Sequence, residues 1–560
     1  MGGVGKTELA LKVAHELKKD FPAQLRVDLQ GTSNHPTSPE TALGFVIRAF
    51  YKDEIKLPNS REELTQLYLQ TLGNKPVLLL LDNAHRPEQV RPFLPPPNCA
   101  LLITSRHPII LPGLTHLDLE TLPPDKAREL FNAIKSGVAP DIADEICNLC
   151  GYLPLAIRAA ATLLDVEIDL DAADYLNELR DERKRLKEIE RVNDEDLSVT
   201  ASFNLSYARL NEEQQRVFRN LSAFPASFDA AAAEAICEDE NHQLLSELLK
   251  RSLVNYSLDR KRYRLHDLVR VYAKDKNAED ESYAAQMHFA QYYLDLAKNA
   301  EDEFIGSDQA LQIPAIKRFD GERDNIFAGQ SWAEGQSPQD NEAAQICNLY
   351  GACFSHLMSL RVNPSDRIPI TTAAVNAAQQ IGDRRNEGGH LGDLGVAYSN
   401  LGDVSKAISF YEQALVIARE IGDCRSEYRS LGNLGSAYQD LGDVPKAISF
   451  SEQALLISRE IGNRRGEGVS LGLLGNAYAK LGNLPKAISF HEQALVISRE
   501  IGDRRGEGRH LANLGLAYYK LEEREKAIAY TEEAIQIHTE IQSPTAETWR
   551  KNLAIFRSEK

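Results

Sequence analysis

The chain has 560 residues, of which 43% are hydrophobic and 26% charged, and its formal net charge is −18. These values are ordinary for folded proteins and exclude a wholly disordered or collagen-like chain, and the length predicts three to five domains. The acidic balance argues against a broadly basic nucleic-acid coat and favours protein partners.

The first residues carry the pattern of a phosphate-binding loop followed by a helix, which we predict over residues 7–21. In a P-loop the glycine amides point at phosphates, the lysine reaches the β- and γ-phosphates, and the threonine hydroxyl holds Mg²⁺. We therefore expect ATP or ADP with Mg²⁺ to bind through Gly2, Gly3, Val4, Gly5, Lys6, Thr7 and Glu8.

The complete P-loop pattern has another glycine five positions before Gly5, which would be one residue before Met1. The strand that precedes such a loop would be missing as well, and in a doubly wound sheet it lies near the centre. We interpret the chain as truncated inside the motif, through a wrongly chosen start codon or a gene fragment. Because such a sheet leaves backbone groups unpaired, we expect residues 1–560 to bind nucleotide weakly or not at all.

Two short apolar runs further along predict parallel strands that end in functional side chains. Residues 77–81 precede Asp82 and Asn83, and residues 100–103 precede Thr104-Ser105-Arg106. A carboxylate after such a strand suits Mg²⁺, and an arginine at the carboxyl edge of a parallel sheet lies where these folds bind ligands. We predict that Asp82 shares Mg²⁺ with Thr7 and that the catalytic residues are Lys6, Asp82 and Arg106.

Two later segments complete an ordered set of motifs. Gly151-Tyr-Leu-Pro154-Leu155 resembles a GLPL motif, and Tyr263 to Val269 resembles an MHD motif around His266. With the P-loop, the Walker B-like strand and the sensor-like arginine, this order resembles the NB-ARC ATPase core of the STAND class over residues 1–273. The resemblance implies that Pro154 contacts the adenine and that His266 contacts the β-phosphate of ADP.

Asn83 departs from the family pattern, because many relatives carry a second acidic residue at this place. An amide cannot take a proton from water as a carboxylate can. The sequence therefore leaves ATP hydrolysis open, and we expect any ATPase reaction to be slow or to need another base.

The seven cysteines do not form the dense, even pattern of a secreted disulfide protein. Cys147 and Cys150 have the spacing of a redox pair or half a zinc site, but no second pair accompanies them, so we interpret both as core residues. No run approaches 18 apolar residues, and the N-terminus lacks the regions of a signal peptide. These features predict a cytoplasmic protein without membrane segments.

Residues 391–398 recur with a period of 40 at residues 431–438, 471–478 and 511–518, and each unit predicts two helices. The first unit places apolar residues at helical spacing in both helices, namely Leu394, Ala397, Tyr398, Leu401, Ala407, Phe410, Ala414 and Ile417. A Leu-Gly-Asp or Leu-Gly-Asn turn joins the helices in the first three units. The pattern resembles a lengthened tetratricopeptide repeat, and residues 549–556 predict a terminal helix that covers the last seam.

Positions that vary among near-identical repeats are candidates for ligand contact, because fold-determining positions should recur. The variable sites of the first helices share one face, which by resemblance to the repeat family lines a groove that holds peptides. Unconstrained drift of surface residues is the alternative reading. The predicted partner-binding residues are Arg429, Gln439, Asp440, Asn476, Lys480, Arg509, Tyr519 and Lys520.

These observations predict a multidomain chain. An incomplete α/β P-loop domain at residues 1–120 precedes a helical domain with the GLPL-like motif at 121–200. A winged-helix-like domain with the MHD-like motif follows at 201–278. A helical linker at 279–338 then leads to an all-α repeat solenoid at 339–560.

Three functions compete at this level. The leading one is an ADP- or ATP-binding signal-transduction switch whose repeats sense a protein or peptide; a nucleotide-dependent homo-oligomer is compatible with this function, and the sequence does not identify the effector output. The second is a repeat scaffold whose truncated nucleotide domain does not function. The third is a transcriptional regulator, suggested by basic residues near the winged helix; we expect these to be a solvated face or intramolecular contacts rather than a nucleic-acid site, namely Arg260, Lys261, Arg262, Arg264 and Arg270.

Overall fold

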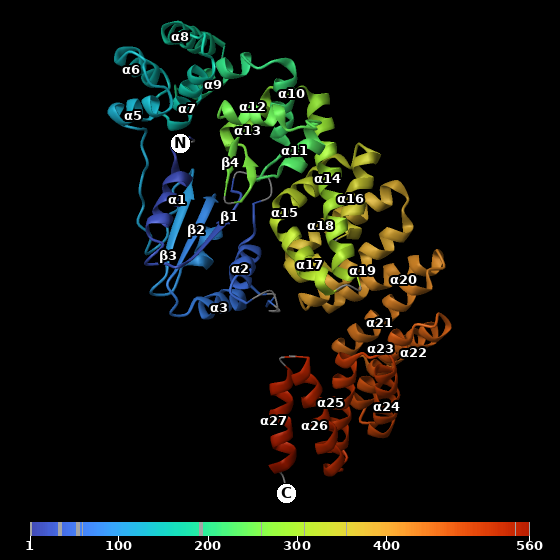
Figure 1. The fold of residues 1–560 in the computed structure, drawn as a ribbon. Helices are drawn as coiled ribbons and strands as arrows, with labels where there is room; N and C mark the ends of the chain where they lie inside the picture. The colour runs from blue at the N-terminus through green and yellow to red at the C-terminus, as the bar shows by residue number, and fades with distance from the viewer. Residues whose placement is uncertain are drawn as a thin grey trace. The chain divides into compact units, whose positions relative to one another are not determined.

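The structure is a computed structural model that describes residues 3–31, 36–51, 57–58, 60–189, 194–258, 260–306, 309–353, 356–541, 543 and 545–558. The chain divides into two compact units (Figure 1). The first comprises Met1–Gln336 and His356–Asp366, and the second comprises Ser337–Ser355 and Arg367–Lys560. The predicted fold class is confirmed, because a small parallel sheet near the N-terminus is followed by helices and then by a helical repeat array.

A three-stranded parallel sheet forms the base of the first unit, in the order β1 (Ala23–Asp28), β2 (Val77–Ala84) and β3 (Ala100–Ser105). The run from Val77 to Leu81 is fully buried, as expected for a parallel strand that is covered on both faces. Because the strands are parallel, Asp28, Asp82 and Ser105 all lie at the same edge of the sheet.

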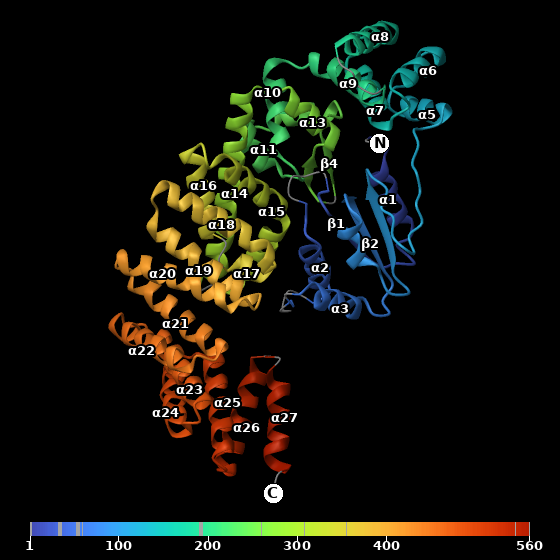
Figure 2. The same cartoon turned by 180° about the vertical axis from the view of Figure 1, so that it is seen from behind.

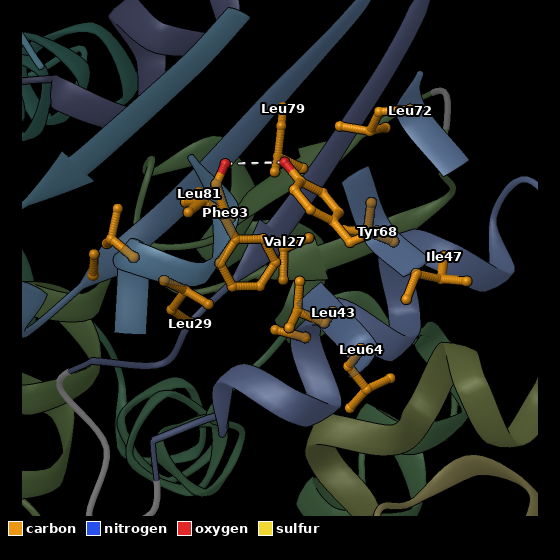
Figure 3. Close-up of a cluster of buried hydrophobic side chains, with 14 of the residues drawn as sticks. Val27, Leu29, Leu43, Ile47, Leu64, Tyr68, Leu72, Leu79, Leu81 and Phe93 are labelled. Atoms are coloured by element: carbon orange, nitrogen blue, oxygen red, sulfur yellow. Dashed lines mark hydrogen bonds between the residues drawn. The ribbon is translucent and has the colours of Figure 1, made fainter. Parts of the chain in front are cut away.

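Three helices accompany the sheet: α1 (Lys6–Glu16), α2 (Pro39–Arg48) and α3 (Arg61–Leu72). Figure 3 shows Tyr68 of α3 among buried leucines and beside Phe93, whose carbonyl accepts a 2.9 Å hydrogen bond from the Tyr68 hydroxyl. The prediction of a helix to residue 21 was too long. Turns follow Glu16, and Pro22 disfavours helical geometry at the residue before it, so the chain leaves the helix before β1.

Helices continue the first unit beyond the sheet; they are α4 (Pro87–Val90), α5 (Pro124–Ile134), α6 (Pro140–Leu149), α7 (Pro154–Val166), α8 (Ala172–Ile189) and α9 (Asp194–Ala208). Cys147 and Cys150 are fully buried and free, and burial raises the pKa of their thiols to about 11 and about 12. Among the described residues no cluster of three or more His, Cys, Asp or Glu could hold a metal ion. The interpretation of this pair as core residues is confirmed.

A compact group of helices with a two-stranded hairpin follows; it contains α10 (Glu212–Asn220), α11 (Ala230–Cys237), α12 (Gln243–Lys250), β4 (Asn255–Ser257), β5 (Arg262–Arg264) and α13 (Asp267–Asp275). The antiparallel hairpin immediately precedes α13, so it fixes the start of that helix. Two long helices, α14 (Glu279–Ile305) and α15 (Gln309–Gln336), then pack along each other. The short helix α17 (Leu357–Arg361) also belongs to this unit.

The second unit begins with α16 (Asn341–Cys353) and most of α18 (Pro364–Ile381). Four pairs of helices follow with the predicted 40-residue period: α19 (Arg384–Asn400) and α20 (Val404–Glu420), α21 (Cys424–Leu441) and α22 (Val444–Glu460), α23 (Arg464–Lys480) and α24 (Leu484–Glu500), α25 (Arg504–Lys520) and α26 (Arg524–Glu540). Figures 1 and 2 show α19, α21, α23 and α25 along one side of the array and α20, α22 and α24 along the other.

Each pair of helices closes on a recurring apolar seam. Rings stack across it in every repeat, as in Tyr438 on Phe450 with centroids 5.4 Å apart. Gly395 is required at its position, because a Cβ there would lie 2.4 Å from a ring carbon of Tyr411. The predicted seam residues of the first repeat are buried or half-buried except Leu401, which is 41% exposed. Leu401 follows the last turn of α19, so the prediction of a seam position there was wrong.

The turns and the last helix agree with the sequence analysis. Gly442 takes a φ of 90°, and Asp443 then caps α22 by accepting a hydrogen bond from the backbone N–H of Lys446. The terminal helix α27 (Thr545–Ser558) covers the last seam, where Phe556 is buried and stacks on Tyr519 with ring centroids 4.1 Å apart. No helix in the described ranges is long and apolar enough to cross a membrane.

Candidate functional site

The glycine-rich loop leads directly into the N-terminus of α1. Gly3 and Gly5 have φ angles of 75° and 96°, a region that side chains other than glycine rarely adopt. Gly5 is the N-cap of α1, which begins at Lys6 and contacts β2 and β3. The first amides of a helix and its dipole favour an anion at this end. Gly2 lies outside the described residues, Val4 is buried, and Glu8 is exposed in the first turn.

Thr7 and Asp82, the predicted Mg²⁺ ligands, are brought together. The Thr7 hydroxyl donates a 2.9 Å hydrogen bond to Asp82 Oδ1, although 75 residues separate them. Thr104 donates to the same oxygen at 2.5 Å, and Arg26 Nη2 lies 2.5 Å from Oδ2. A hydroxyl and a carboxylate are the oxygen donors that Mg²⁺ prefers, so these side chains fit the ion.

Asp82 is a buried carboxylate that is fully compensated. Burial alone would raise its pKa, but Arg26 and the hydrogen bonds from Thr104 and Thr7 outweigh burial and hold the pKa of Asp82 below its usual value. The side chain therefore stays ionised at neutral pH. Sequence reasoning missed Arg26 and Thr104, although both lie on strands next to the one that carries Asp82.

Asn83, which follows Asp82, adopts a left-handed φ of 57°, a conformation that asparagine tolerates better than most residues. Its backbone N–H donates to the Thr104 hydroxyl at 2.9 Å, and its carbonyl accepts from Gly31. The backbone of Asn83 thus fixes the edge of the site.

The MHD-like segment meets the P-loop and the sensor arginine. His266 is the N-cap of α13, where its Nδ1 accepts a 3.2 Å hydrogen bond from the backbone N–H of Leu268. Burial is the largest cause that lowers the pKa of His266 to about 4; Asp267 opposes the shift, and the nearby cations Arg264, Arg106 and Lys6 contribute to it. The ring is therefore neutral at pH 7.

Lys6 and Arg106 lie in the same positive region. Burial lowers the pKa of Lys6, and the charge of Arg106 adds to this effect. Arg106 Nη2 lies 3.3 Å from Asp267 Oδ2, across 161 residues of sequence. The structure thus brings Lys6, Arg106 and His266, which the sequence analysis assigned to three separate motifs, close to one another.

The GLPL-like segment reaches the same place through its helix. Pro154 is the first residue of α7, and Leu155 is the second. A Cβ built on Gly3 would lie 3.4 Å from Leu155 Cβ and 3.2 Å from Leu268 Cδ1 of α13. The N-termini of α1, α7 and α13 therefore converge around the glycine-rich loop, which is an arrangement suited to a phosphorylated ligand.

A second carboxylate at the sheet edge was missed by sequence reasoning. Asp28 ends β1 directly opposite Asp82 in the sheet register. Burial raises the pKa of Asp28 to about 6, although Arg264 Nη2, 3.5 Å away, opposes the shift. Its position at the end of a short strand, like that of Asp82, is the signal that could have identified it.

The basic residues near the hairpin form contacts within the chain. Arg262 pairs with Glu322 of α15, Arg264 with Asp28, and Arg270 with Asp267. The expectation of intramolecular contacts holds for these three side chains.

The predicted partner-binding residues lie on the first helices of the repeats. Arg429, Asp440, Lys480, Arg509 and Lys520 are exposed. The other three are half-buried. The backbone carbonyl of Gln439 accepts a 2.8 Å hydrogen bond from Lys480 Nζ, and the side chain of Asn476 accepts a 3.0 Å hydrogen bond from Asn513. The ring of Tyr519 stacks on that of Phe556. Tyr519 thus packs against the terminal helix, a role that the sequence analysis did not assign to it.

Comparison with known proteins identifies the C-terminal part. Models of the tetratricopeptide repeat match residues 391–425, 426–500 and 469–540. Residues 391–540 are tetratricopeptide repeats. From Leu391 onward, the four helix pairs with the 40-residue period predicted from the sequence lie within the matched residues.

About three-fifths of the chain is similar to bacterial regulators. It is 37% identical over 368 residues to the regulatory protein AfsR of Streptomyces coelicolor, covering 62% of this chain and 36% of that protein. It is 28% identical over 372 residues to a protein of Mycobacterium tuberculosis whose name describes an HTH-type transcriptional regulator, and the match covers 62% of this chain and 40% of that protein. The chain thus spans well under half the length of these relatives.

Among solved structures, the chain aligns with a signal transduction ATPase with numerous domains (STAND) that carries a tetratricopeptide repeat sensor, from Pyrococcus horikoshii. The identity is 17%, the TM-score is 0.44, and the alignment covers 100% of this chain and 90% of that one. The tetratricopeptide repeats predicted for the C-terminal part are confirmed, and a region whose motifs resemble the NB-ARC and STAND class precedes them. The truncation inside the P-loop stays a prediction.

Proposed function

We propose that the chain is the nucleotide-binding and sensing part of a signal-transduction switch. ADP or ATP binds at the P-loop, and a protein or peptide partner binds the repeats. The observation that carries the proposal is the convergence of three helix N-termini with Lys6, Arg106 and His266, which lie at least 100 residues apart in sequence. The relatives named as regulators support a role in signalling.

Each residue of the site has a distinct task in this proposal. The loop amides and Lys6 bind the phosphates, and Thr7 and Asp82 hold Mg²⁺, which neutralises phosphate charge when bound. Pro154 lies at the start of α7 beside the loop, in a position to contact the base. Neutral His266 offers its second ring nitrogen to a phosphate, since Nδ1 is engaged with the Leu268 amide.

The switch follows from contacts between segments. His266 and Asp267 begin α13, and Asp267 pairs with Arg106 beside the loop. A nucleotide that contacts both the loop and α13 binds the closed arrangement more tightly than an open one, so it favours the closed state by that difference in affinity. A partner on the repeats that prefers the open state would promote nucleotide exchange and assembly of a homo-oligomer.

Nucleotide-dependent melting tests the proposal. A chain extended upstream to a complete P-loop, with Mg²⁺ and ADP at about a hundred times the dissociation constant, should gain about 2.7 kcal/mol of stability. Lys6→Ala should abolish most of this gain, whereas Lys12→Ala, an exposed substitution in the same helix, should not.

The same experiment distinguishes the scaffold alternative. If the extended chain gains no stability with nucleotide, or if Lys6→Ala gains as much as the unsubstituted chain, the switch is ruled out and a repeat scaffold remains. The transcriptional alternative predicts duplex DNA binding that falls steeply with salt. The ion pairs of Arg262, Arg264 and Arg270 argue against binding through this segment.

A further inference from the structure

Three of the four first helices begin with a pair of arginines, at residues 384–385, 464–465 and 504–505. In the second repeat, Cys424 takes the place of the first arginine and Arg425 is the second. The first arginine of each pair is used inside the array. Arg464 lies 2.5 Å from Glu467 on its own helix and also pairs with Glu500 on the following helix. Arg384 and Arg504 repeat this arrangement with Glu387 and Glu420, and with Glu507 and Glu540.

The second arginine of each pair takes no part in these ion pairs. Arg425, Arg465 and Arg505 are exposed, and within the described ranges none has an acidic partner at ion-pair distance. Arg385 reaches Asp423 only at 4.0 Å, and its side chain is 78% exposed. The carboxylate of Asp423 is itself engaged in capping α21.

These exposed arginines do not stabilise the helices that carry them. They lie in the first turn, where a cation opposes the helix dipole by about 0.3–1 kcal/mol. All four repeats nevertheless carry arginine here, whereas the position four residues later varies as Gly389, Arg429, Val469 and Arg509. The helix dipole therefore does not account for arginine at this position.

The four positions form a continuous row. The first helices α19, α21, α23 and α25 contact one another in succession and lie along one side of the array (Figures 1 and 2). Residues four apart share a helix face, so Arg429 and Arg509 extend the row beside Arg425 and Arg505. We call this set the arginine ladder, namely Arg385, Arg425, Arg429, Arg465, Arg505 and Arg509.

The acidic residues of the same face are remote from the ladder or engaged. Asp393 and Asp440 lie eight and fifteen residues beyond the ladder position of their helices, which is about 12 Å and about 22 Å along the axis. Asp503 caps α25 through the Gly506 amide. The ladder is therefore a positive strip on a chain whose net charge is −18.

We propose that the arginine ladder binds an extended acidic peptide with a carboxylate at about every third residue. The inference rests on the proposed partner-sensing role of the repeats and specifies the partner's charge. Packed helices are about 8–10 Å apart, and an extended chain rises about 3.3 Å per residue, so three residues span one repeat. Guanidinium groups bind carboxylates through two parallel hydrogen bonds.

A single-stranded nucleic acid fits this surface less well. Such ligands use aromatic side chains as stacking platforms beside the positive groove. Tyr519, the aromatic residue among the variable sites of this face, already stacks on Phe556. The ladder therefore offers guanidinium groups for anions, while the ring of Tyr519 is already used for packing and does not serve as a stacking platform for bases.

The test measures binding of a fluorescent peptide with glutamate at every third position to the full chain. The triple variant Arg425→Gln, Arg465→Gln, Arg505→Gln should bind about tenfold more weakly or worse, since three exposed ion pairs are lost. The control Lys446→Gln, Lys486→Gln, Lys526→Gln removes the same charge from second helices and should bind within about twofold of the unsubstituted chain. Affinity should fall as salt rises.

Equal losses in the two triple variants would overturn the ladder, because net charge alone would then account for binding. Unchanged affinity in the arginine variant, or equal affinity for a peptide with serine in place of glutamate, would overturn it as well. Tighter binding of a single-stranded oligonucleotide would reject a peptide as the ligand. Circular dichroism checks folding, and single variants replace the triple one if its melting temperature falls. ADP-dependent melting is scored separately, so failure of the nucleotide switch remains distinguishable.

Discussion

The candidate nucleotide site and the repeat array use charged residues in opposite ways. At the sheet edge, Asp82 is compensated by Arg26, and Arg106 pairs with a residue 161 positions away. In the array, ion pairs such as that of Arg459 with Glu467 join helices that are neighbours in sequence, and further arginines remain exposed. The site therefore depends on long-range assembly, whereas the array presents a surface that each repeat builds locally.

The largest expected effect comes from the buried ion pair between Arg26 and Asp82 at the sheet edge. Arg26→Ala leaves Asp82 buried without its cation, so we expect a loss of about 3–5 kcal/mol in the free energy of unfolding. Denaturant unfolding followed through Trp332, in a Trp549→Phe background, reports on the first unit. Arg61→Ala, which breaks an exposed pair with Glu40, should cost at most about 1 kcal/mol. If the two substitutions lowered the free energy of unfolding equally, Arg26 would not be needed to balance the buried charge of Asp82.

Packing within a repeat gives the next effect. Leu434 is 0% exposed, and Leu434→Ala leaves a cavity that should cost about 2–5 kcal/mol. Leu441, 53% exposed at the end of the same helix, should lose well under about 1 kcal/mol on substitution by alanine. Fluorescence of Trp549 in a Trp332→Phe background measures both. Similar losses would show that the seam is not the stabilising feature.

A pair of buried histidines makes the array sensitive to acid. Burial, with a smaller contribution from the charge of Arg509, lowers the pKa of His491 to about 4 and that of His510 to about 3; the two rings lie 5.8 Å apart. In the folded state both imidazole rings stay neutral between about pH 6.5 and 4, whereas in the unfolded state they bind protons below about pH 6.5. Stability should therefore be complete above that pH and fall by about 1.4 kcal/mol per unit for each histidine between about pH 6.5 and 4.

The other repeats provide the control for this prediction. Ser451 stands at the position of His491 in its repeat, and Ser470 stands at the position of His510. The variant His491→Ser, His510→Ser should flatten the pH dependence of the unfolding free energy. An unchanged slope would assign acid sensitivity to other groups.

The smallest effect concerns the caps of the second helices. Asp443 caps α22, so Asp443→Ala should cost about 1 kcal/mol. Glu523, at the equivalent position in the last repeat, makes no side-chain cap, so Glu523→Ala should be close to neutral. Thermal melting compares the two, and equal shifts would contradict the role of the cap.

The two regions also differ in how far sequence alone could predict them. The repeat helices, their turns and the terminal cap followed from a 40-residue period, because each contact recurs and lies nearby in sequence. The motif order indicated which segments belong to the nucleotide site. Their contacts, such as Gly3 against Leu155 and Leu268, could not be predicted, since no periodicity links residues so far apart.

Three residues show what could not be predicted from the sequence alone. Arg26 and Asp28 both serve the sheet edge, yet in sequence they are polar residues of an ordinary short strand. Tyr519 looked like a ligand contact because it varies among repeats, but the last repeat has no following repeat, and α27 uses the ring for packing. Variation among repeats can thus reflect an array end as well as a ligand.

The most direct test of the central claim is the affinity for ADP with Mg²⁺ when each converging segment is altered in turn. In the upstream-extended chain, Lys6→Ala in the P-loop, Arg106→Ala after β3 and His266→Ala before α13 should each weaken binding by about tenfold or more, since each loses a polar contact with the ligand. Lys12→Ala should bind as the unsubstituted chain does. If only Lys6→Ala weakened binding, the segments would not form one site; if none did, the chain would not be a nucleotide switch.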